Sequence, residues 1–126
     1  MSQRNGAGEG ADLRRDPVAG VEHDDGVVLV RLAGELDLYN ADALREALFE
    51  AAAQRPERLV VDLTEVRFID STALGVLIEA RAKLANRRGF LLAAPGLETR
   101  RALEISGLDR HFSIHASVDE AVGVKL

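Results

Sequence analysis

The sequence predicts a single α/β domain built on a mostly parallel central sheet of about four to five strands with four helices. Two observations predict this architecture. Short apolar runs rich in β-branched residues alternate along the chain with longer segments in which apolar residues recur at helical spacing. The 126 residues also suffice for one modest hydrophobic core. The expected order is β-β-α-β-α-β-α-β-α, in which helices connect parallel strands.

The first part of the chain predicts a tail, two strands and a helix. Residues 1–17 show no periodicity and are expected to form a flexible tail, which leaves 18–126 as the domain. The run VAGVEHDDG predicts a short edge strand and a turn that ends at Gly26, and VVLVRLAG (27–34) predicts a strand buried on both faces. Asn40 is the expected N-cap of a helix in ADALREALFEAAAQ. The apolar positions of this helix follow the helical repeat: Leu44, Ala47, Leu48 and Ala51.

The rest of the chain predicts three more strands and three more helices. The expected strands are RLVVDL (58–63), GFLLAA (89–94) and HFSIHA (111–116). The second helix is expected from about Thr72 to Arg87, and the third lies in LETRRALEISGL, with Gly107 in the left-handed position after its end. A last short helix follows SVDE, where Ser117 and Glu120 have the spacing of a capping box.

Composition excludes several classes of function. A formal net charge of −5 argues against a general binder of nucleic-acid backbones, and 4% aromatic residues argue against a stacking platform for single strands. The absence of Cys excludes a disulfide framework and a thiolate metal or redox site. The sequence has no apolar signal segment and no apolar run of membrane-spanning length. We therefore expect a cytoplasmic protein with no membrane insertion and no direct nucleic-acid contact.

The residues give little support to a catalytic or metal site. His111 and His115 are expected on one strand, where four residues span roughly 13 Å, too far to share a metal ion. A hydrolase would need two acids, such as Asp37 and Asp70, that converge on a cleft, and no His or Cys motif accompanies them. We therefore expect no enzymatic activity, no metal and no cofactor.

The stretch FIDSTALGVLIEAR (68–81) places Ser71 between an acid and an apolar run. One interpretation is structural, because either Asp70 or Ser71 could cap the helix that follows. Gly75, in the first turn, costs about 1 kcal/mol relative to Ala. This cost favours a second interpretation, in which small residues on either side of an exposed Leu74 let another protein approach the backbone closely.

The same helix carries more apolar residues than burial against a sheet requires. One stripe suffices for that burial: Ala73, Val76, Leu77, Ala80 and Leu84. Leu74 and Ile78 form a second pair, which either packs beneath a neighbouring helix or is presented to a partner. A phosphate on Ser71 would suit the helix N-terminus electrostatically, and its charge would disrupt an apolar contact made through the second pair.

Two segments carry a resemblance to a known family, GELDLYNADALREAL (34–48) and LVVDLTEVRFIDSTALGVL (59–77). Their G-E-[L/I]-D and D-S-[S/T]-x-L-G motifs together resemble the STAS-domain anti-sigma factor antagonists of bacteria. The resemblance covers about Val18 to Val124 and implies a small α/β domain that works by binding. Ala73 stands where the family usually has Gly, and Thr72 replaces a frequent second Ser.

The resemblance implies a switch between partners. The unphosphorylated protein is expected to bind an anti-sigma factor that is also a serine kinase, which frees the sigma factor. The kinase supplies ATP and Mg²⁺ and phosphorylates Ser71, with Thr72 as the alternative acceptor, and a PP2C-type phosphatase reverses the step. A monomer or weak dimer is expected. The residues expected to bind the partner are Glu35, Asp37, Asn40, Asp70, Thr72, Leu74, Gly75 and Ile78.

A second class of function stays open from the sequence alone. The domain could serve as a scaffold or adaptor subunit of a larger assembly, such as a stressosome-like particle or a lipid-transport ATPase complex. A very large species in size-exclusion chromatography would favour the scaffold.

Overall fold

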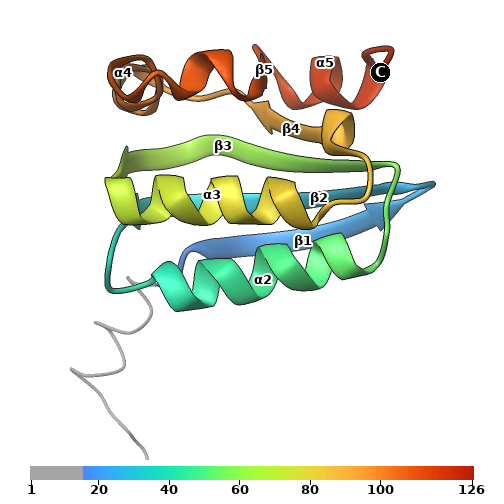
Figure 1. The fold of residues 1–126 in the computed structure, drawn as a ribbon, viewed down its shortest axis with the longest axis horizontal. Coiled ribbons are helices and arrows are strands. Elements are labelled where there is room, and N and C mark those ends of the chain that lie inside the picture. Colours follow the sequence, from blue (N-terminus) through green and yellow to red (C-terminus); the bar gives the residue numbers. More distant parts are fainter. Residues whose placement is uncertain (1–15) are drawn as a thin grey trace, which may run out of the picture.

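The computed structural model describes residues 16–126 (Figure 1). Residues 1–15, most of the segment expected to be a flexible tail, lie outside the described residues. The structure contains two short 3₁₀ helices, η1 (Arg87–Gly89) and η2 (Leu108–Arg110). The helices and strands are β1 (Val18–Asp24), β2 (Val27–Leu36), α2 (Ala41–Ala53), β3 (Arg58–Ile69), α3 (Ser71–Lys83), β4 (Phe90–Ala93), α4 (Leu97–Ser106), β5 (Ser113–His115) and α5 (Val118–Gly123).

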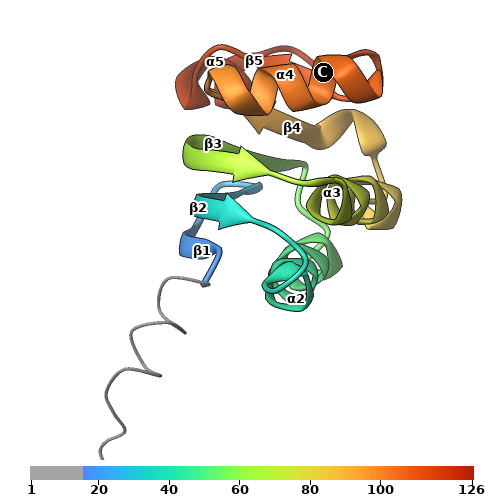
Figure 2. The same cartoon turned by 90° about the vertical axis from the view of Figure 1, so that its left-hand side faces the viewer.

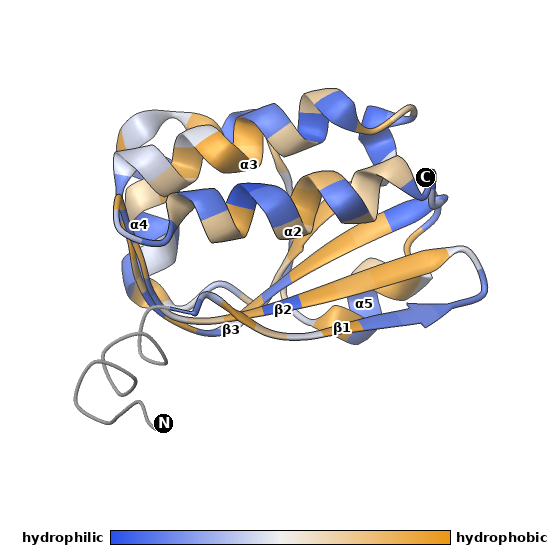
Figure 3. Ribbon diagram, turned by 90° about the horizontal axis from the view of Figure 1, so that it is seen from below, coloured by the Kyte–Doolittle hydropathy of each residue, from blue (hydrophilic) through white to orange (hydrophobic). Residues whose placement is uncertain are grey.

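The strands form one sheet in the order β1-β2-β3-β4-β5. β1 runs antiparallel to β2, and the three other pairs are parallel. Helices α2 and α3 lie side by side on one face of the sheet, and α5 lies on the other (Figures 2 and 3). The predicted fold class and element order are confirmed. In this topology, β2 and β3 end at the edge of the sheet where α2 and α3 begin.

β2 differs from the expectation of burial on both faces. Val28, Val30 and Leu32 are buried, whereas the residues between them are half-buried. The expectation is wrong because the two faces have unequal cover. One face packs under α2 and α3 in the main core, and the other meets only a small cluster around Ala121 of the short helix α5.

β3 is longer than expected, since it runs over Arg58–Ile69 instead of ending at residue 63. Its second half pairs with the end of β2, where Glu35 lies opposite Phe68 and Leu36 opposite Ile69. The register between the two strands shifts twice along this stretch. Such shifts break the alternation of inward and outward side chains, so the two-residue periodicity that would have predicted the strand is absent.

α3 ends earlier than expected, at Lys83 instead of Arg87, because Leu84 adopts an extended backbone conformation. Asn86 then starts η1, where its side chain accepts a hydrogen bond from the Arg88 N–H. The predicted apolar stripe is confirmed, and its five members are buried: Ala73, Val76, Leu77, Ala80 and Leu84.

The predicted signals at the later helix ends are also found. Gly107 follows α4 with φ +79°, in the left-handed region. Ser117 Oγ accepts a hydrogen bond from the Glu120 N–H at 3.0 Å, as a capping box requires. The reciprocal bond differs, since Glu120 Oε1 accepts from Ala116 N–H, one residue before the expected donor.

Candidate protein-interaction site

The residues singled out from the sequence meet at one edge of the sheet. β2 ends at Leu36 and β3 at Ile69, and these two residues are neighbours in the register. The loop 37–40 and the start of α3 follow them directly (Figure 1). A hydrogen bond of 3.0 Å from the Asp70 N–H to the Leu36 carbonyl joins the two segments.

Asp70 connects the loop to the helix through both of its carboxylate oxygens. Oδ1 accepts a hydrogen bond from the Ala73 N–H at 3.0 Å, which makes Asp70 the N-cap of α3. Oδ2 accepts a hydrogen bond from the Leu38 N–H, in the loop 37–40, at 3.2 Å. Of the two candidate caps, Asp70 is therefore the one used, and Ser71 is the first residue of the helix.

The backbone conformation at position 34, the first residue of the G-E-L-D motif, requires glycine. Its φ of +83° lies in the left-handed region, and an added Cβ would meet no atom within 4 Å among the described residues. Conformation, and not lack of space, therefore selects glycine here. The register shifts lie on either side of Ala33 and Gly34, and such an irregularity redirects the end of a strand. It sets the course of the chain that leads into the loop 37–40.

The buried side chain of Asn40 holds the backbone of this loop in place. It occupies the N-cap position of α2, but its side chain makes no capping hydrogen bond, so that part of the expectation is wrong. Its Oδ1 instead accepts from the Asp37 N–H at 2.9 Å, and its Nδ2 donates to the Glu35 carbonyl at 2.8 Å. With 4% of its surface exposed, Asn40 fixes the loop and presents almost nothing to a partner.

The two acids weighed as a catalytic pair both hold main-chain groups. Asp37 Oδ1 accepts a hydrogen bond from the Tyr39 N–H at 3.0 Å, and Asp70 accepts two such bonds. Carboxylates used in this way order the loop and the helix start, and nothing in their arrangement singles them out for proton transfer. The Glu35 side chain is exposed beside this loop and makes no hydrogen bond to any residue of 16–126.

α3 presents an exposed face that starts with Ser71, which we call the Ser71 ridge: Ser71, Thr72, Gly75 and Ile78. Ser71, Gly75 and Ile78 stand at i, i+4 and i+7 and therefore lie along one side of the helix. Both hydroxyl residues are exposed, and Ile78 is 38% exposed. An added Cβ at Gly75 would meet no described atom within 4 Å, so packing inside residues 16–126 does not require glycine there.

Leu74 corrects the expected pattern on this helix. Only 7% of its surface is exposed, so the expectation of an exposed Leu74 is wrong. α2 packs beside α3, which widens the buried face of the helix beyond a single stripe. The second apolar pair is therefore divided, with Leu74 in the core and Ile78 at the surface.

Two large apolar residues beside the ridge were missed by sequence reasoning. Leu38 and Tyr39 are 64% and 72% exposed in the loop 37–40, and the Leu38 N–H is bonded to the cap of α3. Their position in the sequence could have indicated this, because two bulky apolar residues in a short loop between a strand and a helix lie outside the elements that build the core. Exposed apolar groups of this kind are a frequent mark of protein interfaces.

Two features of the helix start favour an anion on Ser71, whereas the adjacent Asp70 carboxylate opposes it. The N–H groups of Ser71 and Thr72 lie in the first turn, where no intrahelical carbonyl is available to them. The helix dipole adds partial positive charge at the same end. Among residues 16–126 no side chain or backbone group is hydrogen-bonded to the Ser71 hydroxyl, which leaves it accessible.

Further along α3, Glu79 accepts a hydrogen bond from Arg45 of α2 at 3.0 Å and raises the pKa of that guanidinium.

The described part of the chain does not gather metal ligands. No group of three or more His, Asp or Glu side chains in residues 16–126 could hold a metal ion. His115 Nε2 lies 3.0 Å from Ser113 Oγ, and His115 Nδ1 lies 3.4 Å from Glu120 Oε1. The His111 ring packs edge-on against Phe112. None of the helices described is long and apolar enough to cross a bilayer.

The fold and this edge of the sheet define a class of protein, a small α/β domain that offers a serine at the start of a helix beside an ordered, partly apolar loop. The chain belongs to the STAS domain family, whose model matches residues 19–121.

Several of the similar proteins are named as anti-sigma factor antagonists. The chain is 35% identical over 102 residues to the anti-sigma-F factor antagonist RsfB of Mycobacterium tuberculosis, covering 81% of this chain and 84% of RsfB. It is 34% identical to the anti-sigma-B factor antagonist of Bacillus subtilis, covering 81% and 94%. A crystal structure of an anti-sigma factor antagonist from Mycobacterium paratuberculosis superposes with a TM-score of 0.76 at 38% identity, covering 81% and 87%. The resemblance seen in the sequence is confirmed.

Proposed function

We propose that this protein is a cytoplasmic anti-sigma factor antagonist that switches partners through Ser71. The unphosphorylated form binds a serine-kinase anti-sigma factor through the Ser71 ridge and the loop 37–40, which frees the sigma factor. Phosphorylation of Ser71 ends this interaction, and a PP2C-type phosphatase restores it. The names of the similar proteins support the first step, since they are antagonists of anti-sigma factors.

The observation that carries the proposal is the exposed Ser71 hydroxyl at the start of a helix whose cap is another residue. Because Asp70 already caps α3, the helix does not need the serine as its N-cap. The ridge continues from Ser71 over Gly75 to the exposed Ile78, with Leu38 in the adjacent loop. This surface combines an acceptor hydroxyl, a place of close backbone approach and apolar area for a partner.

The chemistry of the switch belongs to the partner. The kinase brings ATP, Mg²⁺ and the base, and this chain supplies a positioned hydroxyl and a docking surface. In this account it is a binding protein without a cofactor and not an enzyme. A phosphate adds a charge of about −1.5 to −2, which the helix N-terminus accommodates but an apolar contact through Ile78 and Leu38 does not. The switch therefore needs no refolding.

Phosphosite mass spectrometry of the protein from its native cells tests the acceptor. We expect phosphate on Ser71 whose occupancy changes between resting and stressed cells, and no phosphate at this position in a Ser71→Ala strain. Phosphate on Thr72 alone would keep the mechanism and move the acceptor by one residue. If neither residue is phosphorylated in cells, or in vitro by candidate kinases with ATP, the switch is refuted.

The glycine on the ridge gives a second test. Gly75→Ala is expected to raise the free energy of unfolding by about 0.5–1 kcal/mol, because Ala is the better helix former and its Cβ meets nothing inside the domain. The same Cβ would crowd a closely approaching partner and weaken binding by about tenfold. Urea unfolding and a binding titration with the cognate anti-sigma factor measure the two effects.

Gly123→Ala in α5 is the matched control, since its Cβ also meets no described atom within 4 Å and it lies outside the ridge. It should leave partner binding unchanged. A Gly75→Ala variant that binds as tightly as the wild type would remove Gly75 from the interface.

Size-exclusion chromatography of the same samples should show a monomer or weak dimer, whereas a very large particle would favour the scaffold function.

A further inference from the structure

The outer edge of β1 forms one side of a groove that the proposed switch does not use. β1 is the end strand of the five-stranded sheet, and no strand of residues 16–126 pairs with its outer side. Helix α2 extends past β1 at this end of the sheet (Figures 1 and 2). Between the strand and the helix lies a cavity of about 440 Å³. An unpaired strand beside an overhanging helix leaves a place for one more strand.

The turn between β1 and β2 fixes which main-chain groups of β1 point outward. Both residues of the turn 25–26 have positive φ, +47° and +84°, as a two-residue type I′ turn requires. Such a turn closes on a hydrogen-bonded pair, here Asp24 with Val27, and bonded and non-bonded pairs then alternate along the antiparallel ladder. Val21 and His23 therefore belong to non-bonded pairs, and their N–H and carbonyl groups point away from β2. They offer two donors and two acceptors to an added strand.

The floor of the groove is apolar. Val18 and Val21 of β1 contribute to it, and Val21 is 45% exposed. Alanines at helical spacing line the α2 side: Ala43, Ala47 and Ala51. Arg45, which stands midway between two of them and so points to the opposite side of α2, pairs with Glu79 of α3. The groove therefore faces away from α3 and the Ser71 ridge.

Acidic side chains surround the edge of β1 on both faces of the sheet. The groove on the α2 face has no Lys or Arg in its lining and three acids, Asp16, Glu46 and Glu50. On the other face, a cavity of about 480 Å³ is lined by four acids, Glu22, Asp24, Asp25 and Glu57. Glu22 and Glu57 have arginine neighbours, whereas Asp24 and Asp25 form no ion pair within residues 16–126. The charges around this edge favour a cationic partner.

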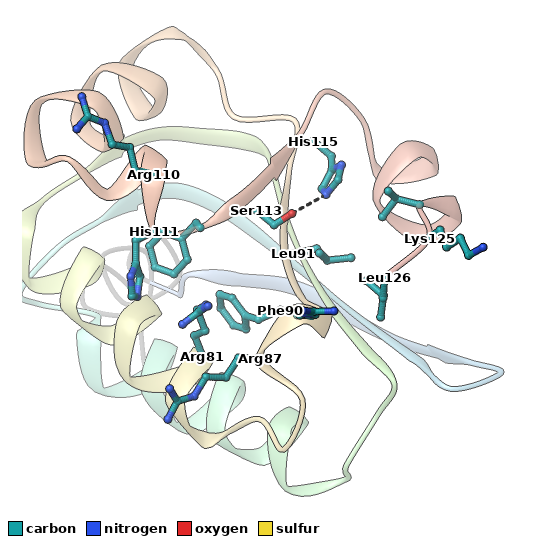
Figure 4. A pocket seen from close by; sticks show the side chains of 13 residues that line it. Arg81, Arg87, Phe90, Leu91, Arg110, His111, Ser113, His115, Lys125 and Leu126 are labelled. Carbon is teal, nitrogen blue, oxygen red and sulfur yellow. Dashed lines mark hydrogen bonds between the residues drawn. The ribbon is translucent and has the colours of Figure 1, made fainter.

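A second copy of this chain does not match the edge. Two β1 edges placed together would bring like charges into contact. The opposite end of the sheet, beside β5, does have a cavity lined by cations and by no Asp or Glu, and Figure 4 shows four of them: Arg81, Arg87, Arg110 and Lys125. The strand β5 itself, however, has three residues against the seven of β1, and none of the three is Lys or Arg.

We propose that the outer edge of β1 binds an extended segment of another protein in which apolar residues alternate with Lys or Arg. The segment adds to the sheet as a strand, and its main chain pairs with Val21 and His23. Because side chains of a strand alternate between the two faces, its apolar residues enter the groove beside α2. Its cations then meet Asp24 and Asp25 on the other face. No residue of the Ser71 ridge takes part, so this binding is independent of the proposed switch.

The acetylated and amidated peptide Lys-Val-Lys-Val-Lys-Val is the probe for this edge, and Glu-Val-Glu-Val-Glu-Val is its comparison. In a ¹⁵N-NMR titration of the full chain, the lysine peptide should shift the backbone amides of 19–24 and 43–51 and saturate. The glutamate peptide should shift none of them. At saturation, hydrogen exchange at the Val21 and His23 amides should slow by about tenfold or more, because both become hydrogen-bonded.

Two substitutions test the main-chain pairing and the groove separately. His23→Pro removes one outward N–H without touching the ladder with β2, and should weaken binding of the lysine peptide by about fivefold. His23→Ala keeps that N–H and should bind within about twofold of the wild type. Ala47→Gln fills the groove and should weaken binding by roughly tenfold. Its matched control is Ala53→Gln, at an exposed position of α2 outside the groove.

Thermal unfolding should confirm that the four variants fold, and the pair at 47 and 53 suffices if His23→Pro does not. Equal weakening by each variant and its control, or equal binding of the two peptides, would overturn the edge site. Shifts at 19–24 that grow with protein concentration in the absence of peptide would assign the edge to a second copy. Tighter binding of a peptide of residues 1–15 at the same amides would assign the groove to the chain's own N-terminal segment. Either assignment would overturn a separate partner.

Discussion

Ser71→Asp is expected to weaken binding to the cognate anti-sigma factor by roughly a hundredfold, whereas Ser71→Ala should bind within about threefold of the wild type. The Asp carboxylate would sit at the start of α3, where the dipole tolerates it, so the fold should be retained. Its charge would face the proposed apolar contact through Ile78 and Leu38, where its desolvation costs free energy. Isothermal titration calorimetry with the purified anti-sigma factor measures both affinities.

A charge control separates the position of the substitution from its charge. Gln54→Glu adds one negative charge directly after the last residue of α2, far along that helix from the loop 37–40. It should change the affinity by less than about twofold, because exposed charges at that distance are largely screened at physiological salt. If Ser71→Asp bound as tightly as the wild type, or if Gln54→Glu weakened binding to the same degree, a local charge switch at Ser71 could not be maintained.

Asp70→Ala should lower the free energy of unfolding by about 2–4 kcal/mol. The substitution removes the N-cap of α3 and also leaves the Leu38 N–H without its acceptor. Asp70→Asn keeps one oxygen and should lose about 1 kcal/mol, mainly because a neutral amide cannot accept both bonds. Urea unfolding monitored by circular dichroism measures these differences.

Asp62, on the strand β3 that precedes Asp70, offers a matched control, because its carboxylate also accepts two hydrogen bonds, both from Thr64. Those bonds stay within β3 and join no second element, so Asp62→Ala should cost less than about 1 kcal/mol. In Asp70→Ala, hydrogen exchange should also rise at the amides of the loop 37–40. An Asp70→Ala variant as stable as Asp62→Ala would show that the link between the loop and α3 contributes nothing.

Partner affinity should fall in Asp70→Ala as well, without any added charge. The loss would come from disorder in the loop that carries Leu38, since a flexible loop must be ordered again on binding. This distinguishes Asp70, which positions the loop, from Ser71, the proposed site of phosphorylation. Binding of Ser71→Ala should therefore stay close to wild type, while that of Asp70→Ala should not.

Much of the fold could be predicted from the sequence because local patterns carry it. The apolar stripe from Ala73 to Leu84 specifies the buried face of α3, and all of it is buried. Gly107 and Ser117 mark helix ends through their own backbone and side-chain chemistry, which needs no distant partner. The motif around Ser71 likewise depends on neighbours in the chain, and its place at a helix start follows from them.

What the sequence pattern missed depends on contacts between distant segments. The second half of β3 is a strand because it pairs with the end of β2 across a shifted register, so its residues show no periodicity. Leu74 is buried because α2 lies beside α3, a contact that the helical repeat of α3 alone does not contain. The hydrogen bond from the Leu38 N–H to Asp70 likewise joins groups 32 residues apart.

The sequence by itself determined the order of elements, the buried stripe of α3 and the motif around Ser71, since each depends on residues a few positions apart. Only the tertiary structure decided which residues around Ser71 reach the surface, because burial is set by the neighbouring helix and loop. It also brought Arg81, Arg87 and Arg110 from three separate segments around one cavity. Long-range packing places such charges together, and no local sequence pattern predicts this arrangement.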